Sequence, residues 1–444
     1  GIPGAPAALA HIARHYGRLP LDVSLQPAIV LARDGFPVDD KYRRMAGFRL
    51  DALRASPAAS AQLLVDGEVP PLGFRLRQPD LAATLEAIAR SDAKAFYHGE
   101  LAGRMVDAVR ADGGIWSLDD LRDYRVVERP TVAAHFRGQR VVSASLPSSG
   151  GVLLAQMLMV LEDFPLERMP TADRVHLLVE VMRRAYADRA RFLGDIDHVQ
   201  VPLARLLDRG EAARRARQID MQRATPSRPA PVDDVEGQDT THFSILDREG
   251  NRVAATLSIN YPFGSGYVAP GTGVLLNDEM DDFSTKPWVA NAYGLVGNEA
   301  NAIAPGKRML SSMSPTFVES EERITILGTP GGSRIISMVL LGLLDAIDGL
   351  PVEQIVSLGR FHHQYLPDRI DVEAGALDPA VLDELKARGH LVREIDDGYG
   401  NMQVVSWDRR SGAVTAASDP RGIGRSAVVE GESRRVPATA AERH

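Results

Sequence analysis

The chain has no cysteine among its 444 residues, so it can form neither a disulfide nor a thiolate metal site. It also has no excess of positive charge, because 51 lysines and arginines stand against 59 aspartates and glutamates, a formal net charge of -8. This balance argues against binding nucleic acid through bulk electrostatics. Long apolar runs are missing too, since one of the longest, residues 335–344, is about half the length of a membrane-spanning helix. We therefore expect no nucleic-acid partner and no membrane segment in this chain.

Two further features are missing from the sequence. The chain opens on Gly1 with no initiator methionine and no visible signal peptide, which is typical of a chain from which a preceding segment, including any targeting signal, has been removed. No internal repeat is found. What is present is an ordinary globular composition, 44% hydrophobic and 25% charged, in a length that suits one large domain or two modest ones.

A polar segment at residues 223–239 divides the chain. Its prolines, acids and glycine are typical of an exposed and poorly packed linker. From residue 241 the pattern changes to the alternation of a strand, followed by a turn at 247–251 and a second strand-forming run at 253–259. Thr240 therefore stands where a cleavable loop meets a predicted hairpin.

Cleavage before Thr240 would give this threonine a special chemistry. Its hydroxyl would lie beside a free α-amine, so one residue would supply both nucleophile and base. An α-amine titrates at about 7.7–8.0, so roughly a third is unprotonated at pH 7.5, against about one part in a thousand for a lysine. Taken alone, this stretch is explained more simply as the ordinary start of a strand.

Most of the chain before the linker has helical spacing. Leu9, Ile12 and Tyr16 mark one face of a helix that ends at Gly17. Further helices are predicted at residues 27–34, 39–53, 79–90, 100–110 and 203–219, and strands at 125–136 and 139–145. A long amphipathic helix includes Arg183 and the neighbouring Arg184, and we interpret this pair as a solvated face.

Several glycine-rich turns follow strands or open helices. Residues 147–151, Pro-Ser-Ser-Gly-Gly, open a helix and allow two interpretations, an anion bound by backbone N–H groups or close helix packing. Residues 330–333, Pro-Gly-Gly-Ser, lie between a strand at 324–327 and an apolar helix at 335–347, which leaves N–H groups at the positive end of a helix and suits an oxyanion. Most turns of this kind have no catalytic role. His362 and His363 are interpreted as structural, because nothing is spaced to complete a metal site with them.

The densest run of glycine and polar residues lies at 260–282. Such a composition is expected where the backbone approaches a ligand and side chains bind it. The acids in this run lack the spacing of a calcium-binding loop and have no histidine among them, so no metal site is expected there. A cluster of acids suits an ammonium group equally well.

The order of these motifs resembles the gamma-glutamyltransferase family, whose members are also called gamma-glutamyltranspeptidases or glutathione hydrolases. The resemblance covers nearly the whole chain and rests on eleven short motifs: GIPG at 1–4, QPA at 26–28, LARDG at 31–35, PSSGG at 147–151, AYADR at 185–189, TTH at 240–242, LLN at 275–277, MDDF at 280–283, SSMSP at 311–315, PGGSR at 330–334 and RFHHQ at 360–364. Each motif is weak alone, but their shared order makes the resemblance specific.

The resemblance implies a role for each matching residue. Thr240 matches the N-terminal nucleophile, which is freed when the precursor cuts itself between Asp239 and Thr240. Ser258 stands where the family usually has a threonine that hydrogen-bonds this nucleophile. The other matches are Gly331 and Gly332 to the oxyanion hole, Asn260, Glu279 and Asp282 to the residues that hold the α-amino group of the glutamyl substrate, Ser311 and Ser312 to those that hold its α-carboxylate, and Tyr293 to an aromatic residue of a flap over the pocket.

The resemblance also implies the fold, the maturation and the partners. The fold class is α+β, a four-layer αββα sandwich of the N-terminal nucleophile hydrolase type. Residues 1–239 form the large-subunit portion and residues 240–444 the small subunit, both cut from one precursor. The substrates are glutathione or another γ-glutamyl compound and an amino acid or peptide acceptor, no cofactor is needed, and the protein is periplasmic or secreted.

One departure from the family stands at the start of the chain. Family members have further large-subunit sequence before the GIPG motif, with an arginine that pairs with the substrate α-carboxylate. That segment is absent from this sequence, so we expect a truncated chain or an incomplete carboxylate clamp, and no arginine present takes the role by its spacing. Two alternatives to the transferase remain open: a related acylase acting on cephalosporin side chains or poly-γ-glutamate, and an uncut protein that only binds.

Overall fold

The computed structural model describes residues 1–227, 240–396 and 398–429. Three segments lie outside the described residues: most of the predicted linker, Asp239 on the other side of the bond before Thr240, and the charged tail at 430–444. The predictions made for those segments are therefore untested by the fold.

A six-stranded antiparallel sheet forms the centre of the fold, with the strand order β15-β14-β10-β9-β4-β3. Its strands are β3 (Val132–Phe136), β4 (Gln139–Ser143), β9 (Thr316–Glu319), β10 (Arg323–Gly328), β14 (Gln403–Asp408) and β15 (Val414–Ser418). The middle strand β10 is buried on both faces from Ile324 to Gly328. Because both of its faces are covered, its sequence is a nearly continuous apolar run.

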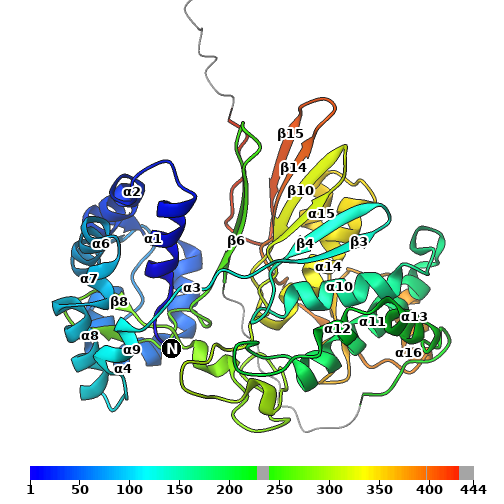
Figure 1. Ribbon diagram of the computed structural model, residues 1–444, viewed down its shortest axis with the longest axis horizontal. Coiled ribbons are helices and arrows are strands. Elements are labelled where there is room, and N and C mark those ends of the chain that lie inside the picture. Colours follow the sequence, from blue (N-terminus) through cyan, green and yellow to red (C-terminus); the bar gives the residue numbers. More distant parts are fainter. Residues whose placement is uncertain (228–239, 397, 430–444) are drawn as a thin grey trace, which may run out of the picture.

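Helices cover one face of this sheet (Figure 1). They are α10 (Gly150–Leu161), α11 (Thr171–Phe192), α12 (Leu203–Leu206), α13 (Arg209–Arg217), α14 (Ile335–Ile347), α15 (Val352–Ser357) and α16 (Pro379–Ala387). Helices α10 and α14 are apolar on nearly every side and almost wholly buried, as expected for helices in the middle of a large core. A three-stranded sheet of β11 (Phe361–His362), β12 (Ile370–Glu373) and β13 (Val392–Ile395) completes this half.

The predicted hairpin forms and packs against the opposite face of the large sheet. It pairs β5 (Thr241–Leu246) with β6 (Arg252–Leu257) in an antiparallel register that sets Thr241 opposite Leu257. His242 is buried beneath it because Gly328 has no side chain, and a Cβ there would collide with the imidazole ring. The other side of the hairpin, which includes Phe243 and Ile245, is exposed.

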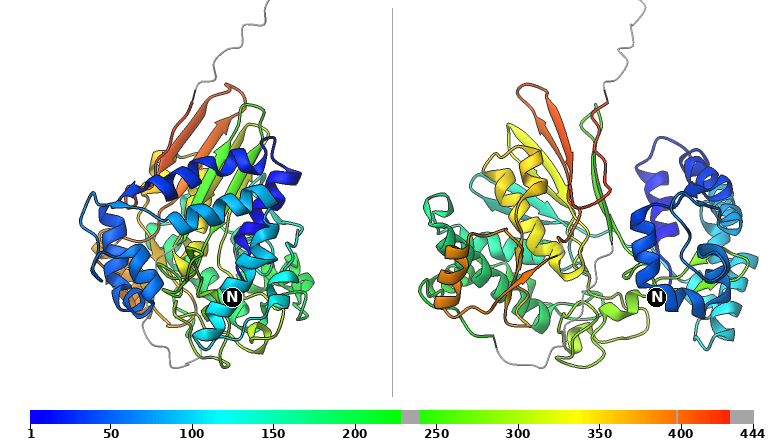
Figure 2. Two further views of the ribbon diagram at one scale, coloured as in Figure 1. Left: turned by 90° about the vertical axis from the view of Figure 1, so that its left-hand side faces the viewer. Right: turned by 180° about the vertical axis from the view of Figure 1, so that it is seen from behind.

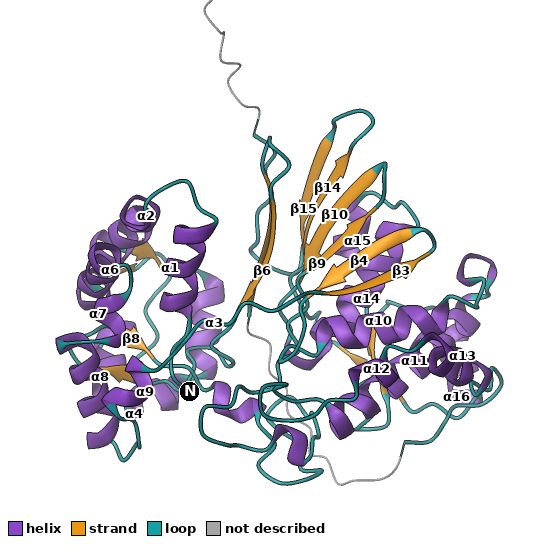
Figure 3. Ribbon diagram, viewed as in Figure 1, coloured by secondary structure: helices purple, strands orange, loops and turns teal. Residues whose placement is uncertain are grey.

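The first 122 residues form a helical lobe beyond the hairpin, as Figure 2 shows from behind. Its helices are α1 (Ala5–His15), α2 (Leu21–Asp34), α3 (Asp40–Phe48), α4 (Leu50–Ala55), α5 (Pro57–Leu63), α6 (Pro79–Ser91), α7 (Lys94–Tyr97), α8 (Glu100–Ala111) and α9 (Leu118–Arg122). Two pairs of short strands join it, β1 (Phe36–Pro37) with β2 (Arg75–Leu76), and β7 (Val268–Ala269) with β8 (Val274–Leu275). The order helices, sheet, hairpin, helices is the predicted αββα arrangement of an α+β fold (Figure 3).

The structure refines several of the predicted elements. The single helix expected at 39–53 is two helices, α3 and α4, joined at Arg49. The strand expected at 125–136 covers only Val132–Phe136. The face of α1 marked by Leu9, Ile12 and Tyr16 is exposed. Within the described ranges, no helix is both long and apolar enough to cross a bilayer.

The interpretation of Arg183 as part of a solvated face is wrong. Its side chain is only 4% exposed and forms ion pairs with Glu180, in the same helix, and with Asp368. Glu180 is fully buried and also binds Arg184 and the hydroxyl of Thr225. Burial alone would raise the pKa of Glu180, but the hydrogen bonds from Thr225 and Arg184 and the charges of both arginines outweigh it and hold this pKa below its ordinary value.

We expect Glu180→Gln to destabilise the protein by about 3–5 kcal/mol, because it leaves two arginines without their buried partner. The folded pKa is lowered, so the carboxylate stabilises the protein above the unfolded pKa of a glutamate, and this contribution is lost as the pH falls through the folded pKa. Urea unfolding at several pH values measures both effects. The control is Glu86→Gln, which removes an exposed partner of Arg90 and should change stability by less than about 1 kcal/mol. Equal effects of the two substitutions would contradict the expectation.

Candidate active site

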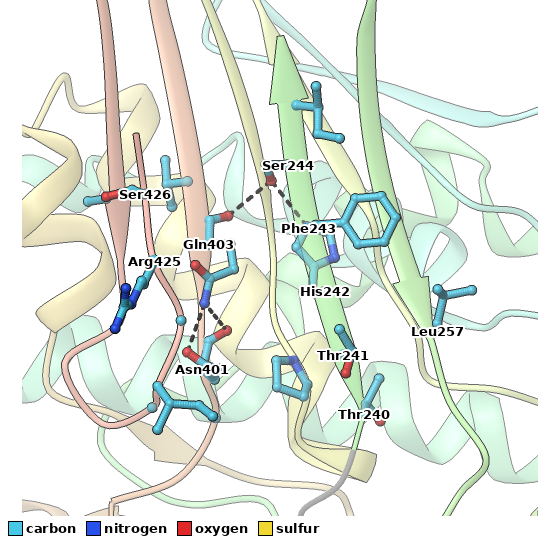
Figure 4. Close-up of a pocket in the computed structure, with 18 of the residues that line it drawn as sticks. Thr240, Thr241, His242, Phe243, Ser244, Leu257, Asn401, Gln403, Arg425 and Ser426 are labelled. Atoms are coloured by element: carbon cyan, nitrogen blue, oxygen red, sulfur yellow. Dashed lines mark hydrogen bonds between the residues drawn. The ribbon is translucent and has the colours of Figure 1, made fainter. Parts of the chain in front are cut away.

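Thr240 lies directly before β5 and, with Ser258, lines a cavity of about 1940 Å³. The lining of this cavity does not include the predicted substrate-binding residues or the paired glycines. Figure 4 shows it at the end of the strand, next to Thr241. Its Oγ1 donates a hydrogen bond of 3.5 Å to Oγ of Ser258, the residue that follows β6. The hairpin register therefore brings together the predicted nucleophile and its predicted hydroxyl partner, which are 18 residues apart in the sequence.

Ser258 is in turn fixed by the loop that follows it. The N–H of Asn260 donates to Ser258 Oγ over 2.9 Å, and the Asn260 side chain donates to the carbonyl of Asp278 over 3.3 Å. Asn260 has a φ of 72°, in the left-handed region that asparagine tolerates better than most residues. This sharp turn places the buried Asn260 between the hairpin and the acid-rich loop.

The paired glycines lie between β10 and α14, as predicted. Gly331 and Gly332 have φ values of 140° and 56°, and Gly332 opens the short helix η4 (Gly332–Arg334). N–H groups at the start of a helix have no acceptor within it, and none is found for these two among the described residues. A side chain on Gly332 would collide with the ring of Tyr293. The turn can therefore direct two N–H groups at a developing negative charge.

Tyr293 connects the glycine turn to the rest of the site. Its ring lies against Gly332, and its hydroxyl donates to the carbonyl of Asn260 over 2.9 Å. The side chain is 7% exposed and stacks on Tyr261 with ring centroids 5.7 Å apart. Burial, followed by the charge of Asp282, raises the pKa of Tyr293, so this residue stays a neutral hydrogen-bond donor.

Both of the predicted amine-binding acids lie in the short helix η2 (Glu279–Asp282). Burial, followed by the charge of Asp278, raises the pKa of Glu279 to about 7, although the Ser258 hydroxyl lowers it in part. Burial, followed by the charge of Glu279, raises the pKa of Asp282 well above its ordinary value. Carboxylates that burial and mutual repulsion make hard to ionise are stabilised by a cationic ligand, so this cluster suits an ammonium group.

The predicted carboxylate-binding loop is held by the Pro-Ser-Ser-Gly-Gly turn. Ser149 donates to the carbonyl of Ser311 from its N–H at 2.8 Å and from its hydroxyl at 2.7 Å, and Ser148 Oγ donates to the carbonyl of Met313. A Cβ on Gly151 would collide with a backbone carbonyl, so close packing requires this glycine. Of the two interpretations of this turn, the geometry favours close packing.

Two residues that sequence reasoning did not assign connect the acids with the serine loop. Asn301, in η3 (Glu299–Asn301), donates to the carbonyl of Asp282 at 2.7 Å and accepts from the N–H of Leu310 at 3.1 Å. Arg189 donates to the hydroxyl of Ser312 at 3.3 Å. Arg189 ends the AYADR motif, so the sequence contained a signal for it, whereas nothing in the sequence marks Asn301.

The predicted site residues thus form two connected groups. Thr240, Ser258, Asn260, Tyr293 and Gly332 follow one another by direct contact. The second group connects Asp282 with the serine loop. Asn301 donates to the carbonyl of Asp282 and accepts from the N–H of Leu310, which directly precedes Ser311 and Ser312. Glu279 joins the two groups, because it interacts with the Ser258 hydroxyl of the first group and lies in the same short helix as Asp282 of the second.

The two neighbouring histidines lie outside these groups. His362 is hydrogen-bonded to Ser337 and Gln364, and His363 to Asp368. Burial lowers the pKa of His362 to about 3 and of His363 to about 4, so both are neutral core residues. In the described part of the chain, no group of three metal-binding side chains is found.

Comparison with known proteins identifies the family of the chain. A family model described as gamma-glutamyltranspeptidase matches residues 1–429. The chain is 40% identical over 431 residues to the glutathione hydrolase proenzyme of Escherichia coli (strain K12), covering 95% of this chain and 74% of the relative. It is 42% identical over 441 residues to the glutathione hydrolase proenzyme of Pseudomonas aeruginosa, covering 97% of this chain and 77% of that relative.

A solved structure shows the same fold. The cephalosporin acylase from Bacillus halodurans matches with a TM-score of 0.85 and 27% sequence identity, covering 97% of this chain and 79% of that chain. The fold is therefore the αββα sandwich of the N-terminal nucleophile hydrolases, as the sequence predicts. From the family match and the two relatives, the chain belongs to the gamma-glutamyltranspeptidase family.

Proposed function

We propose that the protein is a γ-glutamyl hydrolase and transpeptidase that acts on glutathione and other γ-glutamyl amides through a threonyl ester. The observation that carries the proposal is the position of Thr240, at the start of a strand, on a cavity, with Ser258 Oγ 3.5 Å from its hydroxyl. Cleavage of the bond between Asp239 and Thr240 arms this hydroxyl, because it creates an α-amine on the same residue. The relatives are named as proenzymes, which supports such a maturation step.

The reaction then proceeds in two stages. Thr240 Oγ1 gives its proton to its own α-amine and attacks the γ-carbonyl carbon, and the N–H groups of Gly331 and Gly332 stabilise the oxyanion. When the C–N bond breaks, the leaving amine takes the proton and a γ-glutamyl ester remains on Thr240. Water releases glutamate from this ester, or the amino group of an acceptor forms a new γ-glutamyl amide. Ser258 keeps the Thr240 hydroxyl oriented for the first stage.

The two charged ends of the glutamyl group explain the choice of substrate. Asn260, Glu279 and Asp282 bind the α-ammonium group, and the upward shift of the pKa of both acids, caused first by burial, supports a cationic partner for them. Ser311 and Ser312 bind the α-carboxylate. Tyr293 closes the pocket over the glycine turn, where its ring already lies against Gly332.

The maturation step divides the chain at the predicted boundary. Residues 1–239 become the large-subunit portion and residues 240–444 the small subunit. They remain associated because the two parts share one packed core: helices α10 and α11 of the first part and α14 of the second contribute to the main hydrophobic cluster. The family match also supports a location in the periplasm or outside the cell.

Denaturing electrophoresis and a substrate panel test this function. We expect two bands, the smaller with Thr240 as its N-terminal residue by mass spectrometry. Among chromogenic amides, the γ-glutamyl compound should be turned over at least about 100-fold faster in kcat/KM than the glutaryl compound, which lacks only the ammonium group. One persistent band without turnover would instead indicate an uncut binding protein.

A related acylase is the second candidate, favoured by the structural match to a cephalosporin acylase. In that case the glutaryl amide would be the better substrate, because such an acylase would not need to bind an ammonium group. The buried acids argue against it, since an acyl chain without a positive charge would leave Glu279 and Asp282 unpaired.

A further inference from the structure

Arg189 is a buried cation whose direct partners among the described residues are all neutral. Its side chain is near the end of α11 and is 5% exposed. Nε donates to Ser149 Oγ at 3.1 Å, and Nη2 donates to the carbonyl of Leu310 at 3.2 Å and to Ser312 Oγ at 3.3 Å. Other arginines buried to this degree, such as Arg183 and Arg360, form ion pairs with carboxylates.

This difference is unusual because buried charges are normally paired. Within the described residues, no carboxylate lies within 4.0 Å of the Arg189 guanidinium. The charge of Asp282 acts on Arg189 from a greater distance, which raises its pKa against the larger lowering effect of burial. A guanidinium keeps its proton in proteins, so Arg189 leaves a positive potential beside the Ser311 and Ser312 loop.

The hydrogen bond to Ser312 also determines where the serine proton points. A guanidinium has five donors and no acceptor, so Ser312 Oγ must be the acceptor in this contact. Among the described residues this is the one hydrogen bond found at that oxygen. The Ser312 O–H is therefore directed away from Arg189 and is available to a ligand that accepts hydrogen bonds.

Arg189 also couples this loop to the turn that supports it. The Ser149 hydroxyl accepts a hydrogen bond from Arg189 and donates one to the carbonyl of Ser311. One hydroxyl therefore links the arginine to the serine loop. The guanidinium plane is thereby fixed at two ends, by Ser149 at Nε and by the carbonyl of Leu310 at Nη2. Its charge and its donors stay in one orientation, which is what preorganised recognition of an anion requires.

We propose that Arg189 is a positioning residue for the α-carboxylate of the substrate, acting through Ser312 and through its buried positive charge. This inference rests on the proposed function, because it assumes that a γ-glutamyl group binds at the serine loop. It assigns to a residue of this chain a part in carboxylate selection that spacing in the sequence did not indicate.

The test compares two chromogenic substrates that differ at one group. One is a γ-glutamyl 4-nitroanilide, and the other has a carboxamide in place of its α-carboxylate. The wild-type protein should prefer the carboxylate in kcat/KM, and Arg189→Met should reduce that preference by about 10- to 100-fold, mainly through KM. Arg189→Lys keeps the charge and should retain part of the preference, although it loses the forked geometry.

A double-mutant cycle shows whether Arg189 acts through Ser312. Ser312→Ala should lower the preference for the carboxylate, and adding Arg189→Met should lower it by less than the product of the two single effects. Far-ultraviolet circular dichroism and the extent of chain cleavage verify that each variant folds and matures. Arg189→Lys and Ser312→Ala keep the test decisive if Arg189→Met does not fold.

The possible failures are distinguishable. If wild type turns over neither substrate, the proposed function fails before the inference is reached. If wild type is active and Arg189→Lys lowers kcat/KM for both substrates by the same factor, Arg189 is merely structural and the inference is overturned. Fully multiplicative effects in the cycle would exclude action through Ser312.

Discussion

Thr240→Ala should abolish both the cutting of the chain and the turnover of γ-glutamyl amides. Alanine keeps the backbone, and after any cleavage would still carry an α-amine, but it has no oxygen to attack a carbonyl carbon. Loss of a nucleophile typically lowers turnover by at least about 10⁴-fold. Because the same hydroxyl would attack the preceding peptide bond during maturation, we expect one band on a denaturing gel and no release of 4-nitroaniline.

Two variants separate this effect from a simple disturbance of the hairpin. Thr240→Ser restores a hydroxyl and should recover cleavage and part of the activity. Thr241→Ala changes the next residue, which is exposed and pairs with Leu257 across the hairpin, and should leave both processes intact. Release of 4-nitroaniline by purified Thr240→Ala protein, or cleavage at its usual position, would show that another group is the nucleophile.

Much of the fold could be predicted because its signals are local. The alternation after Thr240, the turn at 247–251 and the apolar run at 335–347 each depend on neighbouring residues, and the structure has the expected hairpin and helix there. The burial of Arg183 could not be predicted, because its partner Asp368 is 185 residues away. A pair of arginines on an amphipathic helix has the same local pattern whether it meets solvent or a distant carboxylate.

The candidate site shows the same division between local and distant signals. The glycine turn at 331–332 was predicted from its strand and helix neighbours, and Ser258 from its match to a position where the family usually has a threonine. Asn301 was not predicted, because its two side-chain contacts, to Asp282 and Leu310, form only when separate loops pack together in the folded protein. The direction of the Ser312 hydroxyl is a property of the assembled site, since it follows from the donor that lies behind it.

Asp282→Asn should remove the preference for the ammonium group while leaving the shape of the site intact. Asparagine keeps the oxygen that accepts from Asn291 at 3.3 Å, and the contact of Asn301 is made to the backbone carbonyl. Loss of one partner of a buried charge pair costs about 2–5 kcal/mol. We therefore expect kcat/KM for the γ-glutamyl amide to fall by about 100- to 1000-fold, with a change of less than about threefold for the glutaryl amide, measured by 4-nitroaniline release.

The neighbouring acid provides the matched control for this substitution. Asp281 belongs to the same short helix, and its side chain accepts from the N–H of Ala292 at 2.9 Å, which asparagine can also do. Asp281→Asn removes the same charge from the same cluster, so a small effect there would show that position, and not total negative charge, selects the ammonium group. Equal losses of kcat/KM for the γ-glutamyl amide in the two variants would mean that the cluster attracts the ammonium group only through its total negative charge. Equal losses on both substrates for Asp282→Asn would place the ammonium group elsewhere.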